Sequence, residues 1–241
     1  MRADEFVANA LKISRNKASE LIKNSKILAG GVLLTKAAQN LDENTEISCV
    51  SDIFVSRGAL KLKSFLENAN IDIKGKNALD IGSSTGGFVQ ILLLNGAKSV
   101  VCVDVGSDQL DSSLRADKRV EVHENTDIRD FKSDERFDIV TADISFVSLN
   151  LILPSIKRLA NDDIIMLFKP QFEVGRTAKR DKKGVVKDEK ACNNAIKAFE
   201  LECAKMGFVY QSSQNCAIKG KNGNQEIFYH YKVANFNKAE K

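Results

Sequence analysis

From residue 77 onward, the chain alternates between short strand-like runs and segments with a helical spacing of apolar residues. The strand-like runs are NALDI, SVVCVDV, VEVHE, FDIVTADIS and IIMLFKP, and the helical patterns lie near residues 87–95, 108–115, 148–160 and 189–206. Parallel strands need a crossover connection, which is usually a helix. The alternation therefore predicts an α/β domain with a mostly parallel sheet and helices on both of its faces.

The end of the chain departs from this alternation. Two strand-like runs, FVYQSSQNCAI and QEIFYHYKV, follow one another and are joined by KGKNGN. A short connection rich in Gly and Asn favours an antiparallel hairpin. We expect this hairpin at the edge of the sheet, which then has seven strands in a Rossmann-like domain spanning residues 59–241.

The first 50 residues predict a separate small α+β domain. Apolar residues at helical spacing between residues 3 and 12 predict one helix, and Ser14 is a candidate N-cap for a second. KILAGGVLLT predicts a hairpin with Gly30 and Gly31 at its turn, and TEISCV predicts a further strand. Residues 51–58 are the expected linker, and SRGALKLKSFLENAN predicts a helix leading into the larger domain.

Composition excludes several classes of protein. No apolar run approaches the roughly 20 residues that a membrane span needs. The N-terminus lacks the separate basic and apolar regions of a signal peptide, so we expect a cytoplasmic protein. The five cysteines form no CxxC pair, which argues against a disulfide framework or a zinc site, and we expect no metal. His123 and His230 lie in strand-like segments, so we do not expect histidine-based catalysis.

Positive charge is concentrated at the start of the chain. Residues 1–36 hold seven basic and three acidic side chains, whereas the whole chain has a net charge of +4. Such an uneven distribution suggests a polyanionic partner, although a solvated face of mixed charge would give the same count.

The segment DIGSSTGG, at the end of the first strand of the larger domain, is the candidate cofactor loop. Ligands of doubly wound sheets bind beyond the carboxyl ends of the strands. Gly82 allows a tight turn, and Gly86 and Gly87 would let the backbone approach a ligand. Asp104 ends the second strand, where a carboxylate can accept hydrogen bonds from ribose hydroxyls.

The same loop argues against a dinucleotide. A pyrophosphate calls for G-x-G-x-x-G at a helix N-terminus, and this spacing is absent. Asp80 suits a cation better than a diphosphate, which points to S-adenosylmethionine; the alternative is an Asp that only caps the turn. Asp127 follows the third strand, where it could reach an adenine amino group or simply face solvent.

Four charged residues stand at strand ends or beside the sheet, namely Lys61, Asp143, Lys169 and Glu226. Lys169 ends a strongly apolar run, and burying an ammonium group without a partner is costly. A partly buried lysine is a candidate general base. The alternative is a structural network of salt bridges.

Together, SRGALKL, DIGSSTGGF, VTADISFVSL, FKPQFEVG, KGVVKD and GNQE resemble the TlyA (hemolysin A-like) ribosomal RNA methyltransferases, which belong to the FtsJ-like 2′-O-methyltransferases. The N-terminal segment resembles a small RNA-binding domain first described in a ribosomal small-subunit protein. The resemblance covers residues 2 to about 233. One departure is Asn24, where the RNA-binding domain often has Gly.

The resemblance implies transfer of a methyl group from S-adenosylmethionine to the ribose 2′-hydroxyl of a cytidine in ribosomal RNA. It implies a catalytic tetrad of Lys61, Asp143, Lys169 and Glu226, with Lys169 taking the hydroxyl proton. The implied cofactor-binding residues are Asp80, Gly82, Ser84, Thr85, Gly86, Gly87, Phe88, Asp104, Val105, Asp127, Ile128 and Asp143. The family's shorter members are associated with the large ribosomal subunit only, so we expect a large-subunit substrate.

Contacts to RNA phosphates are expected from basic residues in two regions. The candidates are Arg2, Arg15, Lys17, Lys23, Arg57, Arg176, Lys179, Arg180, Lys182 and Lys183. The last five lie in a basic loop after Lys169, which could clamp the substrate or be a disordered surface loop. Alternative functions are a noncatalytic ribosome-associated RNA-binding protein, a haemolysin and, more remotely, a dehydrogenase.

Overall fold

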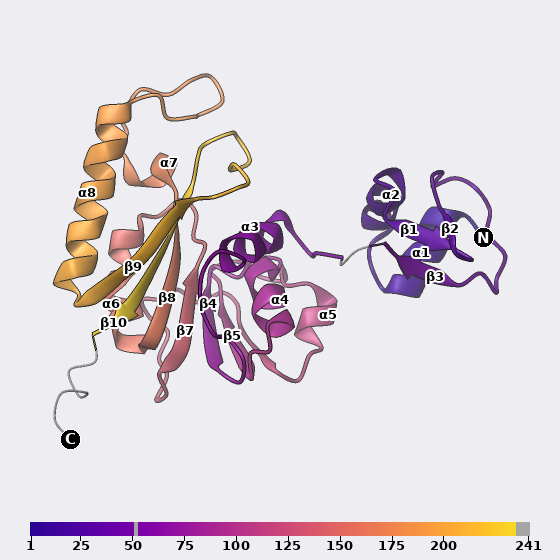
Figure 1. The fold of residues 1–241 in the computed structure, drawn as a ribbon, viewed down its shortest axis with the longest axis horizontal. Coiled ribbons are helices and arrows are strands. Elements are labelled where there is room, and N and C mark those ends of the chain that lie inside the picture. Colours follow the sequence, from indigo (N-terminus) through magenta and orange to yellow (C-terminus); the bar gives the residue numbers. More distant parts are fainter. Residues whose placement is uncertain (51–52, 235–241) are drawn as a thin grey trace. The chain divides into compact units, whose positions relative to one another are not determined.

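The computed structural model describes residues 1–50 and 53–234, which fall into two compact units (Figure 1). The first unit ends at Ile53 and the second begins at Phe54. Of the linker expected at residues 51–58, residues 51–52 lie outside the described part of the chain, as do residues 235–241 of the larger domain. Phe54 and Val55, which fall within the expected linker, pack against a hydrophobic core of the second unit.

The first unit packs two helices against a three-stranded antiparallel sheet. Its elements are α1 (Ala3–Leu11), α2 (Arg15–Lys23), β1 (Ile27–Ala29), β2 (Val32–Leu33) and β3 (Ile47–Cys49), with the strand order β2-β1-β3. Ser14 caps α2 by accepting a hydrogen bond from the Lys17 amide. Gly30 and Gly31 make the turn between β1 and β2 with positive φ angles, as the sequence predicts.

The second unit is built on a seven-stranded sheet with the order β6-β5-β4-β7-β8-β10-β9. Its strands are β4 (Asn77–Ile81), β5 (Ser99–Val103), β6 (Val120–His123), β7 (Phe137–Ala142), β8 (Ala160–Phe168), β9 (Phe208–Asn215) and β10 (Ile227–Val233). The first five strands are parallel, and β10 pairs antiparallel with both β8 and β9. This confirms the Rossmann-like sheet with an antiparallel hairpin at its edge.

Helices cover both faces of this sheet (Figure 1). One face packs against α6 (Leu153–Leu159) and α8 (Glu189–Lys205), through residues such as Ile156 and Phe199. The other packs against α3 (Arg57–Leu66), α4 (Gly87–Leu94) and α5 (Ser112–Arg115), through residues such as Phe65 and Leu92. Two shorter elements, η1 (Leu149–Leu151) and α7 (Pro170–Glu173), follow the strands that carry the candidate site.

The helix expected at residues 108–115 is shorter than predicted, because it begins only at Ser112. Glu124 explains the difference, since its carboxylate accepts hydrogen bonds from the backbone amides of Asp108, Gln109 and Leu110. Those amides are thereby satisfied outside a helix. Asp111 then caps the single helical turn that follows.

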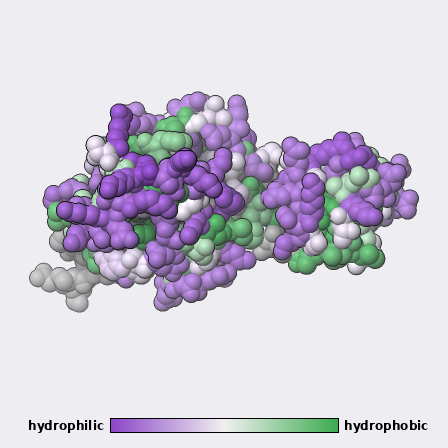
Figure 2. Space-filling model, turned by 90° about the horizontal axis from the view of Figure 1, so that it is seen from above, coloured by the Kyte–Doolittle hydropathy of each residue, from purple (hydrophilic) through white to green (hydrophobic). Residues whose placement is uncertain are grey.

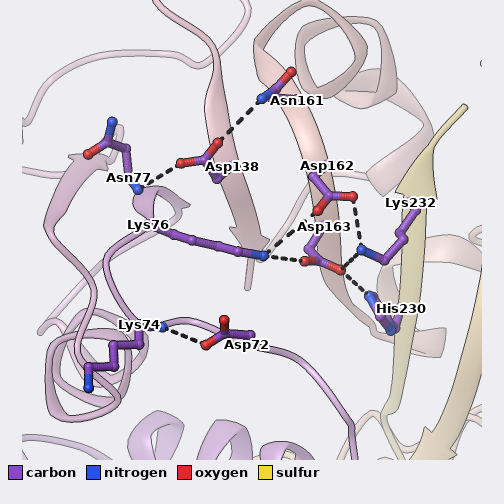
Figure 3. Close-up of polar contacts among 10 residues, drawn as sticks. All are labelled: Asp72, Lys74, Lys76, Asn77, Asp138, Asn161, Asp162, Asp163, His230 and Lys232. Carbon is purple, nitrogen blue, oxygen red and sulfur yellow. Dashed lines mark hydrogen bonds and ion pairs between the residues drawn. The ribbon is translucent and has the colours of Figure 1, made fainter. Parts of the chain in front are cut away.

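A polar cluster lies at the amino ends of the parallel strands (Figure 3). It is at the opposite end of the sheet from the glycine loop, residues 80–87. At its centre is Asp163, which is almost fully buried. The Asp163 carboxylate lies 2.8 Å from Nε2 of His230, 3.0 Å from Nζ of Lys76 and 3.2 Å from Nζ of Lys232. His230 is therefore part of a buried polar network.

Hydrophilic residues cover most of the face seen in Figure 2, with smaller groups of hydrophobic residues between them. None of the helices in residues 1–50 and 53–234 combines the length and the apolar character needed to cross a bilayer.

Candidate active site

The glycine loop turns sharply between β4 and α4, and at each of its three glycine positions a larger side chain would clash or strain the backbone. A Cβ on Gly82 would lie 3.0 Å from the carbonyl oxygen of Asp143, at a φ of +81°. A Cβ on Gly86 would overlap Leu114, and one on Gly87 would lie 2.7 Å from the Ala59 amide nitrogen. Gly86 and Gly87 therefore allow the loop to pack against α5 and α3, in addition to the approach of a ligand that we expected.

A cavity of about 380 Å³ opens at the carboxyl ends of β4, β5 and β7. Of the expected cofactor residues, those lining it are Gly82, Ser84, Asp104, Val105, Asp127, Ile128 and Asp143. Gly86 lines neither this cavity nor the one beside it. Phe88 is buried, with its ring 6.0 Å from that of Phe228, and it lines the cavity beside this one.

Asp104 is held in a fixed orientation by the backbone. Its Oδ2 accepts a hydrogen bond from the Ser84 amide and its Oδ1 accepts one from the Gly106 amide, both at 2.7 Å. Each carboxylate oxygen can accept a further bond. Asp104 can therefore receive ribose hydroxyls, whereas Asp127 already pairs with Arg129 at 2.6 Å and would have to share its carboxylate with an adenine amino group.

A second cavity of about 260 Å³ adjoins the first, and both are lined by Gly82, Ser84, Asp143 and Ser145. Its remaining lining residues include Arg57, Lys61, Asp80, Thr85, Gly87 and Lys169. The cofactor candidates Asp80, Thr85, Gly87 and Phe88 thus lie on the side of the two lysines. The shared wall would place a group bound in the first cavity next to the charged residues of the second.

The four charged residues expected at strand ends form two ion pairs. Nζ of Lys61 lies 2.6 Å from Oε2 of Glu226, and Nζ of Lys169 lies 2.6 Å from Oδ1 of Asp143. Lys169 also donates a hydrogen bond to Oγ of Ser145 at 2.8 Å. Both lysines are at least 90% buried, so each ammonium depends on its carboxylate partner.

Asp80 is buried at the base of the second cavity. Oγ1 of Thr141 donates a hydrogen bond to its Oδ1, while its Oδ2 has no hydrogen-bond partner in the described residues. Burial raises the pKa of Asp80 to about 7, the Thr141 hydrogen bond opposes this rise, and the nearby carboxylates of Asp143 and Asp104 add to it. An unpaired buried acceptor fits a ligand that carries a cationic amino group.

Phe146 is a site residue that sequence reasoning missed. It follows β7, lines the first cavity and is 90% exposed, with a φ of +68° that non-glycine residues rarely adopt. Its ring lies 5.3 Å from that of Phe172 on α7. The motif VTADISFVSL contains Phe146, but an aromatic residue in such a motif would ordinarily be assigned to the core.

The basic residues expected to bind RNA differ in whether they already form ion pairs within the protein. Arg2 and Arg15 both pair with Asp4. Hydrogen bonds from their guanidinium groups, with the larger effect from Arg2, hold the pKa of Asp4 well below its usual range. Lys17 pairs with Glu20, whereas Lys23 is exposed and has no ion pair within the described residues. Arg57 is exposed at the first turn of α3.

Within the basic loop, Arg180 differs from its neighbours. Its guanidinium donates hydrogen bonds to five backbone carbonyls between Gln171 and Ala178, at 3.1–3.4 Å. Arg180 is thus a brace for the loop and is not free to bind a phosphate, contrary to our expectation. Four other cations project into solvent, namely Arg176, Lys179, Lys182 and Lys183.

The sheet order, the glycine turn and the acid at the end of β5 define a Rossmann-like domain of the kind found in methyltransferases. The model of the FtsJ-like methyltransferase family matches residues 54–233. The chain belongs to this family and, within it, to the TlyA (hemolysin A-like) group.

Two relatives and one solved structure illustrate the likeness. The chain is 50% identical to the 23S rRNA (cytidine-2′-O)-methyltransferase TlyA of Campylobacter jejuni, over 96% of this chain and 99% of that one. It is 38% identical to the 16S/23S rRNA (cytidine-2′-O)-methyltransferase TlyA of Mycobacterium tuberculosis, over 93% and 86%. A solved Streptococcus thermophilus structure, described as that of a hemolysin, has a TM-score of 0.72 and 30% identity, covering 98% of this chain and 89% of that one.

Proposed function

We propose that this protein transfers a methyl group from S-adenosylmethionine to the 2′-hydroxyl of a cytidine ribose in ribosomal RNA. The observation that carries the proposal is the pair of buried lysines, each bound to a carboxylate, beside a cavity that contains Asp104. The names of two relatives support the substrate, because both are called rRNA (cytidine-2′-O)-methyltransferases.

The residues of the two cavities fit this cofactor. Asp104 would hold the ribose hydroxyls, and the unpaired Oδ2 of Asp80 would accept a hydrogen bond from the amino group of the methionine end, directly or through water. When bound, S-adenosylmethionine supplies an electrophilic methyl group on a sulfonium centre. The shared wall of the two cavities would direct this methyl group toward Lys169.

In the proposed mechanism, the ammonium of Lys169 first releases a proton to solvent, and the resulting neutral amine then receives the proton of the ribose hydroxyl. Asp143 and Ser145 fix the position of its Nζ, at 2.6 and 2.8 Å respectively. Lys61, fixed by Glu226, would orient the ribose. Holding the hydroxyl in line with the methyl group accounts for much of the rate acceleration expected of such a site.

We further propose that the substrate is the large ribosomal subunit and that the protein acts in the cytoplasm. The name of the Campylobacter jejuni relative, at 50% identity, supports the large subunit. Binding of folded RNA would use Lys23 of the first unit and the exposed cations of the basic loop, since phosphate contacts supply affinity largely independently of sequence.

The proposal is tested by incubating the protein with labelled S-adenosylmethionine and separated ribosomal subunits, and then mapping any methylated ribose. We expect label on a cytidine 2′-oxygen of the large subunit. Lys169→Ala should lower kcat by about 10²-fold or more while retaining cofactor binding. The matched control is Lys183→Ala, which should keep kcat. Label on a base, or no transfer to either subunit, would refute the proposal.

A further inference from the structure

Two loops with no sequence proximity meet beside the candidate active site. The basic loop, residues 176–187, connects α7 to α8, and the hairpin loop, residues 216–226, connects β9 to β10 and ends at Glu226. Figure 1 shows both loops projecting beyond the same end of the sheet. Within residues 1–50 and 53–234, the side chain of Asn224 joins them by hydrogen bonds.

Asn224 is buried, with 4% of its surface exposed. Its Oδ1 accepts a hydrogen bond from the Val186 amide at 2.9 Å, and its Nδ2 donates a longer one to the Gly184 carbonyl at 3.4 Å. Its own carbonyl accepts a hydrogen bond from the Gly220 amide, which closes the hairpin loop. The side chain therefore fixes the basic loop to the segment that carries Glu226.

Other hydrogen bonds shape each loop from within, and Val185 of the basic loop lies beside Gly223 of the hairpin loop. The Asp181 carboxylate accepts hydrogen bonds from the amides of Lys183 and Val185, both at 2.9 Å. Arg180 braces the start of the basic loop through its bonds to backbone carbonyls. The basic loop thus has a defined turn of its own, and Asn224 sets where this turn lies relative to the hairpin.

The joined loops present cations from both sides. Arg176, Lys179, Lys182 and Lys183 are exposed on the basic loop, and Lys219 and Lys221 are exposed on the hairpin loop. Within the described residues, none of these six is in an ion pair. Unpaired cations on two loops held at one position form a surface suited to a polyanion with regularly spaced charges, such as an RNA backbone.

We propose that Asn224 is a positioning residue, and that it holds the two loops together so that they bind RNA phosphates as one surface. The proposal rests on the proposed function and adds Lys219 and Lys221 to the RNA-binding residues. It also separates two roles in the hairpin: Glu226 serves the reacting centre, while Asn224, two residues earlier, serves substrate binding.

The test is Asn224→Ala, measured by binding to the large ribosomal subunit over a range of salt concentrations. Its matched control is Asn215→Ala, an exposed amide on β9. Although Asn224→Ala removes no charge, we expect the slope of log Kd against log salt concentration to flatten by about two, as if two phosphate contacts were lost. KM for the RNA should rise about fivefold or more, in keeping with such contacts, with kcat and cofactor affinity unchanged.

A double-mutant cycle distinguishes positioning from general damage. Lys182→Gln with Lys183→Gln should weaken binding strongly in the wild-type background and only slightly in Asn224→Ala, because the displaced loop no longer contributes these contacts. An unchanged salt slope, or full additivity in the cycle, would overturn the inference. Both readouts measure binding, so they remain informative even if the wild-type protein transfers no methyl group and the proposed function fails.

Discussion

Lys61 and Glu226 are separated by 165 positions in the chain, yet Nζ of Lys61 lies 2.6 Å from Oε2 of Glu226. The lysine comes from α3, which precedes the sheet, and the glutamate precedes β10, which is inserted between β8 and β9. Both side chains are buried, so the pair joins the beginning and the end of the larger unit at the candidate site.

This pair leads to a prediction about stability and activity. Glu226→Leu leaves the Lys61 ammonium buried without a partner and should lower the free energy of unfolding by about 3–5 kcal/mol. The double variant Lys61→Met/Glu226→Leu removes both charges and should recover most of this loss, yet neither variant should transfer methyl groups. Urea unfolding and the transfer assay measure the two effects. A double variant as unstable as Glu226→Leu would show that charge burial is not the cause.

The raised pKa of Asp80 predicts a pH dependence of cofactor binding. With a pKa of about 7 in the free protein, Asp80 is largely protonated at pH 6 and largely ionised at pH 8. A cationic amino group prefers the ionised form, so affinity should rise up to about tenfold between pH 6 and pH 8 and level off above that. Calorimetric titration with S-adenosylhomocysteine measures this change, and Asp80→Asn should abolish it. An equally steep pH dependence in Asp80→Asn would assign the effect to another group.

Phe146 is predicted to contribute to substrate binding without stabilising the fold. Because its side chain is 90% exposed, Phe146→Ala should change the free energy of unfolding by no more than about 0.5 kcal/mol. Aromatic side chains beside an RNA site stack on bases with about 1–3 kcal/mol each, so transfer to RNA should fall about tenfold. Phe146→Trp should retain transfer. The control is Leu201→Ala, an exposed residue on α8, and an equal loss in that variant would contradict the prediction.

The Asp163 cluster predicts a structural effect that is independent of activity (Figure 3). Burial would raise the pKa of Asp163, but hydrogen bonds from His230, Lys76 and Lys232 outweigh it and hold the pKa well below its usual range. A carboxylate with a lowered pKa in the folded state contributes stability above its unfolded pKa of about 4, and this contribution is lost as the pH falls further.

Asp163→Asn should therefore lower the free energy of unfolding by about 3 kcal/mol at pH 7. It should also make stability less sensitive to pH below about 4 than in the wild type. Urea unfolding between pH 3 and pH 7 measures both effects. Methyl transfer at neutral pH should be retained, because the cluster lies at the opposite end of the sheet from the glycine loop. Asp72→Asn, an exposed neighbour, serves as the control and should behave like the wild type.

The sequence by itself determined the architecture of the larger unit, because the alternation of strand-like and helical segments reports which side chains must be buried. It also predicted the short helices and hairpin of the first unit through local signals such as Ser14 and the Gly30–Gly31 turn. Local signals failed where a distant side chain satisfied the backbone. At residues 108–110, Glu124 holds the amides that would otherwise have begun a helix.

Sequence patterns also selected the residues of the candidate site, since charged side chains at the ends of apolar strands need a reason to be there. Only the tertiary structure decided how these residues pair, because partners such as Lys61 and Glu226 are brought together by the order of the strands. Likewise, only the folded chain shows that the Arg180 guanidinium donates hydrogen bonds to backbone carbonyls, whereas Lys182 and Lys183 face solvent. The sequence states which charged and polar side chains are present. Which of them are paired within the protein and which face solvent depends on long-range packing.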